Sequence, residues 1–177
     1  ASEAADGMAF LGMAGYDTNQ ILASMPGLLD LAAAGAMELG NAADITTNIM
    51  SSFGIEAEKT GHVADVLAHA SANANTNVEQ MGEAIKYLGP VANSLGWELE
   101  ESAAAVMSLS NAGIQGSMAG QAFASSLSRL ANPTKKMAET MDELGISFFD
   151  ANGNMKSLPA VIAEIERGTA GMNAEQR

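Results

Sequence analysis

Apolar residues recur along the chain at helical spacing, in short segments that glycine separates. Residues 38–53 carry Ile45, Ile49 and Phe53 at positions i, i+4 and i+8, which places all three on one helix face. The same spacing predicts helices along most of the remaining chain, most clearly over residues 57–74, 78–95, 98–112 and 117–131. We therefore expect a compact, mostly all-α domain of about eight to nine helices.

Glycine and proline indicate where these helices end. Gly54 and Gly96 each follow a periodic segment and suit the left-handed residue that commonly closes a helix. Pro26 has no N–H and disfavours helix in the preceding residue. The sequence therefore predicts a break there, with one helix over residues 19–25 and another from residue 26. A kink or short break is expected at Pro90 for the same reason.

Part of the pattern occurs twice. A shift of 42 residues aligns residues 53–58 (FGIEAE) with residues 95–100 (LGWELE), and the preceding apolar positions also fall in register. This predicts an internal helix–turn–helix repeat, roughly over residues 39–74 and 81–112. No low-complexity linker divides the chain, so residues 1–177 are expected to form one domain. We interpret the sequence as a piece of a longer polypeptide.

Near the C-terminal end the helical pattern is interrupted. Residues 146–149 (ISFF) are short and β-prone, and residues 150–153 (DANG) are typical of a turn. A small β-hairpin near residues 146–156, packed on the helices, is therefore expected. The same letters resemble the start of a calcium loop, but an EF-hand needs glycine at position 6 and glutamate at position 12. Here Gly153 is fourth and Val161 is twelfth, which favours the turn.

Composition favours a helical protein and argues against several classes of binding site. Charged residues make up 16 % of the chain, the hydrophobic set 47 % and aromatic residues 5 %. The net charge is −13, with 21 acidic and 8 scattered basic residues, so this segment is not expected to bind nucleic acid directly. Cysteine is absent, which excludes disulfides and thiolate zinc sites.

Two groups of ionisable residues are candidates for chemistry. His62, Asp65 and His69 can share a helix face, but the two histidines lie two turns apart, roughly 10 Å, too far to share one ion. The glutamates at 98, 100 and 101 fall in the first turn of a predicted helix, where the helix dipole favours negative charge. No catalytic triad, phosphate loop or metal motif is apparent, so we predict neither an enzyme nor a cofactor.

Small residues and one tryptophan are the candidates for helix packing or for contact with a partner. Residues 102–128 contain no charge and are long enough to span a bilayer, but serine and glycine interrupt them. The Gly116–Gly120 spacing allows close helix approach. Together with Gly113 and Trp97, these glycines are the residues we single out.

Several segments resemble the core region of phage tail tape measure proteins. The most specific matching segments are residues 110–117 (SNAGIQGS) and residues 89–92 (GPVA). The similarity covers nearly the whole chain. Further matching segments are residues 43–45, 53–55, 76–84, 86–88, 130–134 and 149–155.

The resemblance implies a structural function. Tape measure proteins are long, mostly helical proteins that run along the lumen of the phage tail in several copies. Their length sets the tail length while the tail tube polymerises around them, and they leave the tail ahead of the DNA. The expected location is the tail lumen of the virion, after synthesis in the bacterial cytoplasm. Expected partners are further copies of the chain, the tail tube, the tail tip, tail assembly chaperones and the host membrane.

Two alternatives stay open at this stage. The uncharged residues 102–128 can be read as a membrane-active helical hairpin that acts during genome ejection. The chain can also be a non-catalytic interaction module of another assembly. The resemblance carries no catalytic residues for the core region, so none are assigned.

Overall fold

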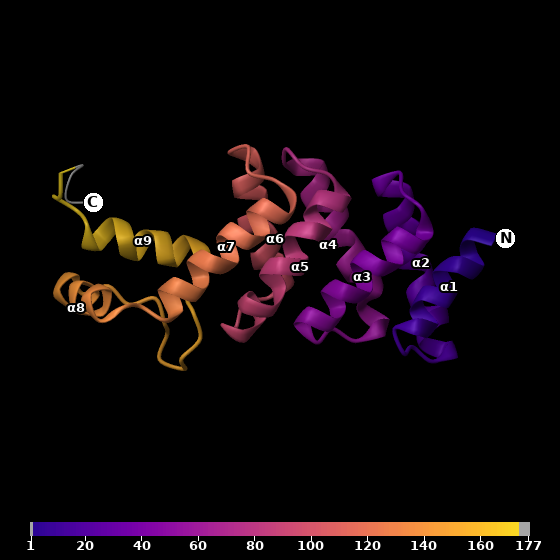
Figure 1. Ribbon diagram of the computed structural model, residues 1–177, viewed down its shortest axis with the longest axis horizontal. Coiled ribbons are helices and arrows are strands. Elements are labelled where there is room, and N and C mark those ends of the chain that lie inside the picture. Colours follow the sequence, from indigo (N-terminus) through magenta and orange to yellow (C-terminus); the bar gives the residue numbers. More distant parts are fainter. Residues whose placement is uncertain (1, 174–177) are drawn as a thin grey trace.

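The computed structural model describes residues 2–173, which form nine α-helices and one short 3-10 helix (Figure 1). The all-α prediction with eight to nine helices is confirmed for this range. In chain order the helices are α1 (Ser2–Met13), α2 (Thr18–Gly35), α3 (Leu39–Phe53), η1 (Ala57–Lys59), α4 (Thr60–Asn73), α5 (Val78–Ser94), α6 (Leu99–Asn111), α7 (Gly116–Ala131), α8 (Lys135–Leu144) and α9 (Leu158–Gly168).

The helices α1 to α7 stack along one axis in two layers (Figure 1). From α3 to α7, each helix packs against the helix two positions earlier: α3 on α1, α4 on α2, α5 on α3, α6 on α4 and α7 on α5. The layer of α1, α3, α5 and α7 therefore faces the layer of α2, α4 and α6. Such stacks bury a continuous core because each pair of helices covers its neighbour.

One turn geometry joins the helices at six places. In each turn a large side chain follows a residue with positive φ, and its N–H donates to the carbonyl five residues earlier. This is the Schellman arrangement, which pairs carbonyls that the helix end leaves free. The six donor–acceptor pairs are Tyr16–Leu11, Met37–Ala32, Ile55–Met50, Trp97–Ala92, Ile114–Leu109 and Ile146–Met141.

Five of these turns have glycine at the positive-φ position, and one has Ala36, at φ 48°. A side chain in this left-handed region costs about 1–2 kcal/mol relative to glycine. Since Ala36 is exposed and contributes no buried contact, Ala36→Gly is expected to raise the free energy of unfolding by about 1 kcal/mol, measured by urea denaturation.

The matched control is Ala23→Gly, at an exposed position inside α2. There glycine is expected to lower stability by about 0.5–1 kcal/mol, because it loses more backbone freedom on folding. Equal effects of the two substitutions would contradict this account of the turn.

The predicted break at Pro26 is wrong, because α2 is continuous from Thr18 to Gly35. Pro26 removes one hydrogen bond to the carbonyl of Leu22. Both residues are exposed, Leu22 by 60 %, so this carbonyl faces solvent and water can hydrate it. Pro90 is likewise exposed inside α5, which extends unbroken past it to Ser94.

The predicted β-hairpin is also wrong. Within residues 2–173 no strand forms, and a single antiparallel bridge joins Phe149 to Met155. Two hydrogen bonds flank this bridge, from Asp150 N–H to the Asn154 carbonyl at 2.9 Å and from Lys156 N–H to the Phe148 carbonyl at 2.8 Å. The Lys156 carbonyl, which would accept the next bond of the ladder, accepts from the Trp97 indole instead, and Met155 N–H donates to the Leu95 carbonyl at 2.9 Å. This segment is a turn that is hydrogen-bonded to the helical stack.

Two clusters of buried apolar side chains hold the stack together. The smaller lies at the N-terminal end and consists of Leu11, Met25, Leu28, Leu39 and Ala43. The larger extends from Leu31 in α2 through Trp97 to Val161 in α9. The turn after α8 and the start of α9 therefore share a core with the central helices.

Candidate functional site

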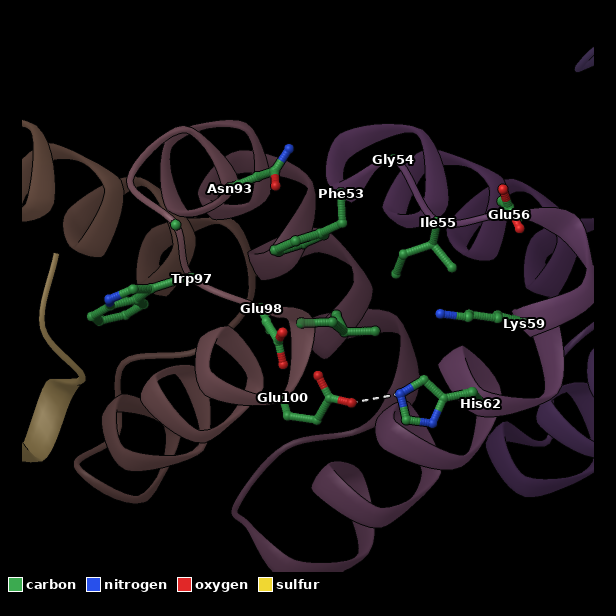
Figure 2. A pocket seen from close by; sticks show the side chains of 12 residues that line it. Phe53, Gly54, Ile55, Glu56, Lys59, His62, Asn93, Trp97, Glu98 and Glu100 are labelled. Carbon is green, nitrogen blue, oxygen red and sulfur yellow. Dashed lines mark hydrogen bonds and ion pairs between the residues drawn. The ribbon is translucent and has the colours of Figure 1, made fainter. Parts of the chain in front are cut away.

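A cleft of about 580 Å³ lies between two of the six turns, the one after α3 and the one after α5 (Figure 2). Its walls come from both turns and from the helices that follow them. The residues that line it are Phe53, Gly54, Ile55, Glu56, Lys59, His62, Asn93, Gly96, Trp97, Glu98, Leu99 and Glu100.

A contact between a histidine and a carboxylate crosses this cleft. Figure 2 shows His62 of α4 opposite Glu100 of α6, with Nε2 and Oε1 2.5 Å apart. Both side chains are about half exposed, 52 % and 49 %, and an ion pair in that setting contributes less than about 1 kcal/mol. The sequence placed His62 beside Asp65 and gave Glu100 only a helix-start function, so it missed this pairing across 38 residues.

The cleft is lined by acidic and basic side chains. Glu56, Lys59 and Glu98 supply charges in addition to those of His62 and Glu100. Charged side chains around an open cleft can hold a polar or charged partner segment.

The candidate metal residues do not converge. His62 pairs with Glu100. His69 lies beside Asn73, which follows it one turn later in α4. Asp150, first in the segment that resembles a calcium loop, accepts the N–H groups of Asn152 and Asn154 through Oδ1 and so closes its own turn. In the part of the chain that the structure describes, no three His, Cys, Asp or Glu side chains could hold one ion.

Trp97 lies inside the protein, away from the His62–Glu100 pair (Figure 2). Its side chain is 2 % exposed, and its ring centroid is 5.8 Å from that of Phe123 in α7. The indole Nε1 donates to the Lys156 carbonyl at 3.1 Å. Trp97 therefore joins the α5–α6 turn, α7 and the turn after α8.

The three predicted glycines occupy different environments. Gly113 (φ 89°) forms the turn between α6 and α7, and Gly116 (φ 57°) begins α7. Gly120 lies directly on α5: a Cβ there would be 2.8 Å from the carbonyl carbon of Ala84 and 2.9 Å from its Cα. Gly120 is thus the one of the three that sets the distance between two helices.

The uncharged residues 102–128 form most of α6, the turn after it and most of α7. Several of their apolar side chains are buried in the core, among them Ala105, Val106, Ala119 and Leu127. Among residues 2–173 no single helix has the length and apolar composition of a membrane span. Only α2 and α3 taken together have that length and apolar composition, and the chain bends by 114° between these two helices.

Glu101 and Glu164 form hydrogen bonds that hold the C-terminal part of the chain. Glu101 of α6 accepts the Leu158 N–H at 2.9 Å, at the start of α9. Glu164 accepts from Lys156 Nζ at 2.8 Å and from Arg167 Nη2 at 2.6 Å. The bond from Lys156, and then that from Arg167, lowers the pKa of Glu164 to about 2 from its ordinary 4.5.

This lowered pKa predicts a pH dependence. Because Glu164 is more acidic in the folded chain, its bonds stabilise the fold above pH 4.5, and this contribution is lost as the pH falls toward 2. The stability advantage of wild type over Glu164→Gln, measured by urea denaturation, is expected to be full at pH 6 and to shrink below about pH 4.5. An advantage that stays constant down to pH 2 would contradict these bonds.

Comparison with known proteins places the chain in a family. Residues 1–177 match the family model described as phage-related minor tail protein. The chain is 47 % identical over its full length to the tape measure protein of Pneumococcus phage Dp-1, and it covers 15 % of that protein. It is 32 % identical over 166 residues to the probable tape measure protein of Escherichia phage P2, of which it covers 20 %. No solved structure matches.

These matches confirm the resemblance to tape measure proteins that the sequence indicated. The chain spans a fifth or less of the length of these two relatives, whereas the family model matches all of it. The chain therefore belongs to the family of phage-related minor tail proteins.

Proposed function

We propose that this chain is a folded helical module of a phage tail tape measure protein, and that it contributes to tail length, tail assembly and genome delivery. The observation that carries the proposal is the 47 % identity to the Dp-1 tape measure protein over all 177 residues. Identity of this extent along the whole chain supports a common architecture as well as a common origin.

The fold is consistent with a mechanical function. Seven helices pack in two layers, and turns of one geometry close five of them, α1, α2, α3, α5 and α6. A stack of this kind holds its ends at a fixed separation, since each helix is buried against neighbours on either side. We interpret the 42-residue repeat over residues 39–74 and 81–112 as one unit of this stack.

A binding function suits the cleft between the turns better than catalysis. It is open to solvent, crossed by the His62–Glu100 pair and lined by further charges from Glu56, Lys59 and Glu98. Such a surface favours contact with another protein segment through charge and shape. We propose that the partners are further copies of the chain, the tail tube, the tail tip and the assembly chaperone, and that the module lies in the tail lumen.

The test is an in-frame deletion of the codons for residues 1–177 from the phage or prophage genome that encodes this chain. Tail length is measured by electron microscopy of negatively stained particles. Shorter tails of uniform length are expected, because the deleted segment no longer contributes to the distance that the tube covers. Tails of unchanged length would contradict the proposal. A phage with Met118→Ala, which alters only an exposed residue of α7, serves as the control.

A further inference from the structure

The last two helices are attached to the stack in a different way from the seven before them. Within residues 2–173 the extensive helix–helix contacts join α1 to α7, and neither α8 nor α9 takes part in one. Figure 1 shows both helices beyond α7. We call residues 135–168, which comprise α8, the turn after it and α9, the α8–α9 unit. Because no broad helix face joins this unit to the stack, its position depends on the contacts of its turn.

Hydrogen bonds inside the α8–α9 unit connect its parts. Glu164 of α9 accepts from Lys156 Nζ in the turn at 2.8 Å and from Arg167 Nη2 at 2.6 Å. Arg167 Nη2 also donates to the Gly145 carbonyl at the end of α8, at 2.5 Å. These bonds link the end of α8, the turn and α9, so the unit can move as one body.

The contacts between the unit and the stack converge on the α5–α6 turn. Residues 155–158 of the unit are hydrogen-bonded to Leu95, Trp97 and Glu101. Met155 and Val161 of the unit are buried in the same core as Trp97. The turn and the first turn of α9 are therefore what holds the unit on the stack.

A short connection joins the unit to the stack along the chain. Only residues 132–134 lie between the end of α7 and the start of α8, and Asn132 and Thr134 are exposed. Hinges are commonly a few loop residues of this kind, which absorb a change of backbone angles without disturbing a buried core. The unit therefore has one place to turn and one set of contacts to break.

We propose that the α8–α9 unit opens as one body about residues 132–134 and uncovers Trp97 at the edge of the candidate cleft. The opening breaks the contacts of one turn and leaves the core of α1 to α7 intact, so it requires less free energy than global unfolding.

The opening changes the cleft because the unit lies against two of its lining residues, Gly96 and Trp97. A Cβ on Gly96 would be 3.1 Å from the Cβ of Asn154 in the turn, and the indole N–H of Trp97 donates to the Lys156 carbonyl. In the open state the indole and the α5–α6 turn join the surface that a partner segment can contact. This extension of the cleft rests on the proposed binding function, whereas the opening is a property of the fold.

The absence of cysteine allows buried positions to be probed one at a time. Met155→Cys and Val161→Cys place a thiol in the unit at positions that are 4 % and 3 % exposed, and Val106→Cys places one in α6 at a fully buried position. Reaction with a thiol reagent requires opening, and each rate is divided by that of the same chain unfolded in urea. The two unit cysteines are expected to react at rates within about twofold of each other, and at least about tenfold faster than Val106→Cys.

Ile49→Val separates opening from global unfolding. Ile49 is fully buried in α3, outside the α8–α9 unit. Its truncation is expected to speed the reaction of Val106→Cys by about fivefold, because it destabilises the stack. The reaction of Met155→Cys and Val161→Cys should stay unchanged, since Ile49 remains packed when the unit opens. An equal acceleration of all three cysteines would overturn the proposal, because global unfolding alone would then expose them.

Hydrogen exchange of the unmodified chain gives a second measurement that needs no substitution. The amides of Met155 and Val161 are expected to share one protection factor, at least about tenfold below that of the Trp97 amide, which is bonded inside the stack. Equal protection of all three amides would overturn the opening. So would loss of protection at Val161 alone, since α9 would then fray by itself. Either result leaves the tail-length test of the proposed function unaffected.

Discussion

Gly120→Ala is expected to destabilise the protein by about 3 kcal/mol or more, although it adds a single methyl group. The new Cβ would lie 2.8 Å from the carbonyl carbon of Ala84 and closer still to its carbonyl oxygen. These are backbone atoms in the middle of α5, so no side chain can rotate away. The helices α5 and α7 must move apart, and the neighbouring core around Ala119 and Leu127 loses contact with them. Urea denaturation of the purified chain measures the effect.

Gly61→Ala is the matched control for this substitution. Gly61 is also helical, in α4, but a Cβ there meets no atom within 4 Å. Alanine is expected to raise stability at that position by about 0.5–1 kcal/mol, because it has the higher helix propensity. If the two substitutions shift the urea midpoint in the same direction, the close α5–α7 contact is not what holds these helices.

Trp97→Ala is expected to cost about 3–5 kcal/mol, the range for removing a fully buried large side chain. The substitution removes the ring that packs on Phe123 and the N–H that donates to the Lys156 carbonyl. Thermal unfolding measures the loss. Hydrogen exchange reports where it acts: protection of the Met155 amide, which bonds to Leu95, is expected to fall more than that of the Ile55 amide, which bonds to Met50.

Trp97→Phe separates the two contributions of the side chain. Phenylalanine keeps most of the aromatic contact and loses the hydrogen bond, a change of about 1 kcal/mol beyond the volume lost. A Trp97→Ala protein as stable as wild type, with an unchanged Met155 amide, would mean that the turn after α8 is held by other contacts.

The sequence predicted the helices well because each carries its own local signals. The spacing of Ile45, Ile49 and Phe53 and the caps at Gly54 and Gly96 require no knowledge of distant residues. The same turn recurs in places where the letters differ. At residues 36–37, for example, alanine takes the positive φ and methionine follows it, so a search for glycine alone overlooks the turn.

The break at Pro26 and the β-hairpin were wrongly predicted because both depend on contacts with distant residues, which local sequence patterns do not contain. Residue 26 lies on the solvent side of α2, where a missing hydrogen bond costs little, and that side is known only once α4 is packed against the helix. The hairpin does not extend beyond one bridge because the Lys156 carbonyl accepts from the indole of Trp97, about 60 residues earlier in the chain, and not from the facing segment.

Trp97 and Gly120 were singled out from residue type and spacing, and the structure places them beside Phe123 and Ala84. Their part in contact with a partner stays a prediction. The cleft itself was not predicted, because it needs two turns that lie 42 residues apart in the chain to lie side by side. The internal repeat was the one available signal for it, since residues 53–58 and 95–100 supply most of the lining.

We propose that this part of a tape measure protein acts as a folded stack and not as an extended rod. The most direct measurement is the amount by which tails shorten when residues 1–177 are deleted in frame. As one straight helix these residues would span roughly 265 Å, at about 1.5 Å per residue. A uniform shortening clearly smaller than that length is predicted, because the helices lie side by side along the stack. Shortening by the full length of a straight helix would contradict the folded module.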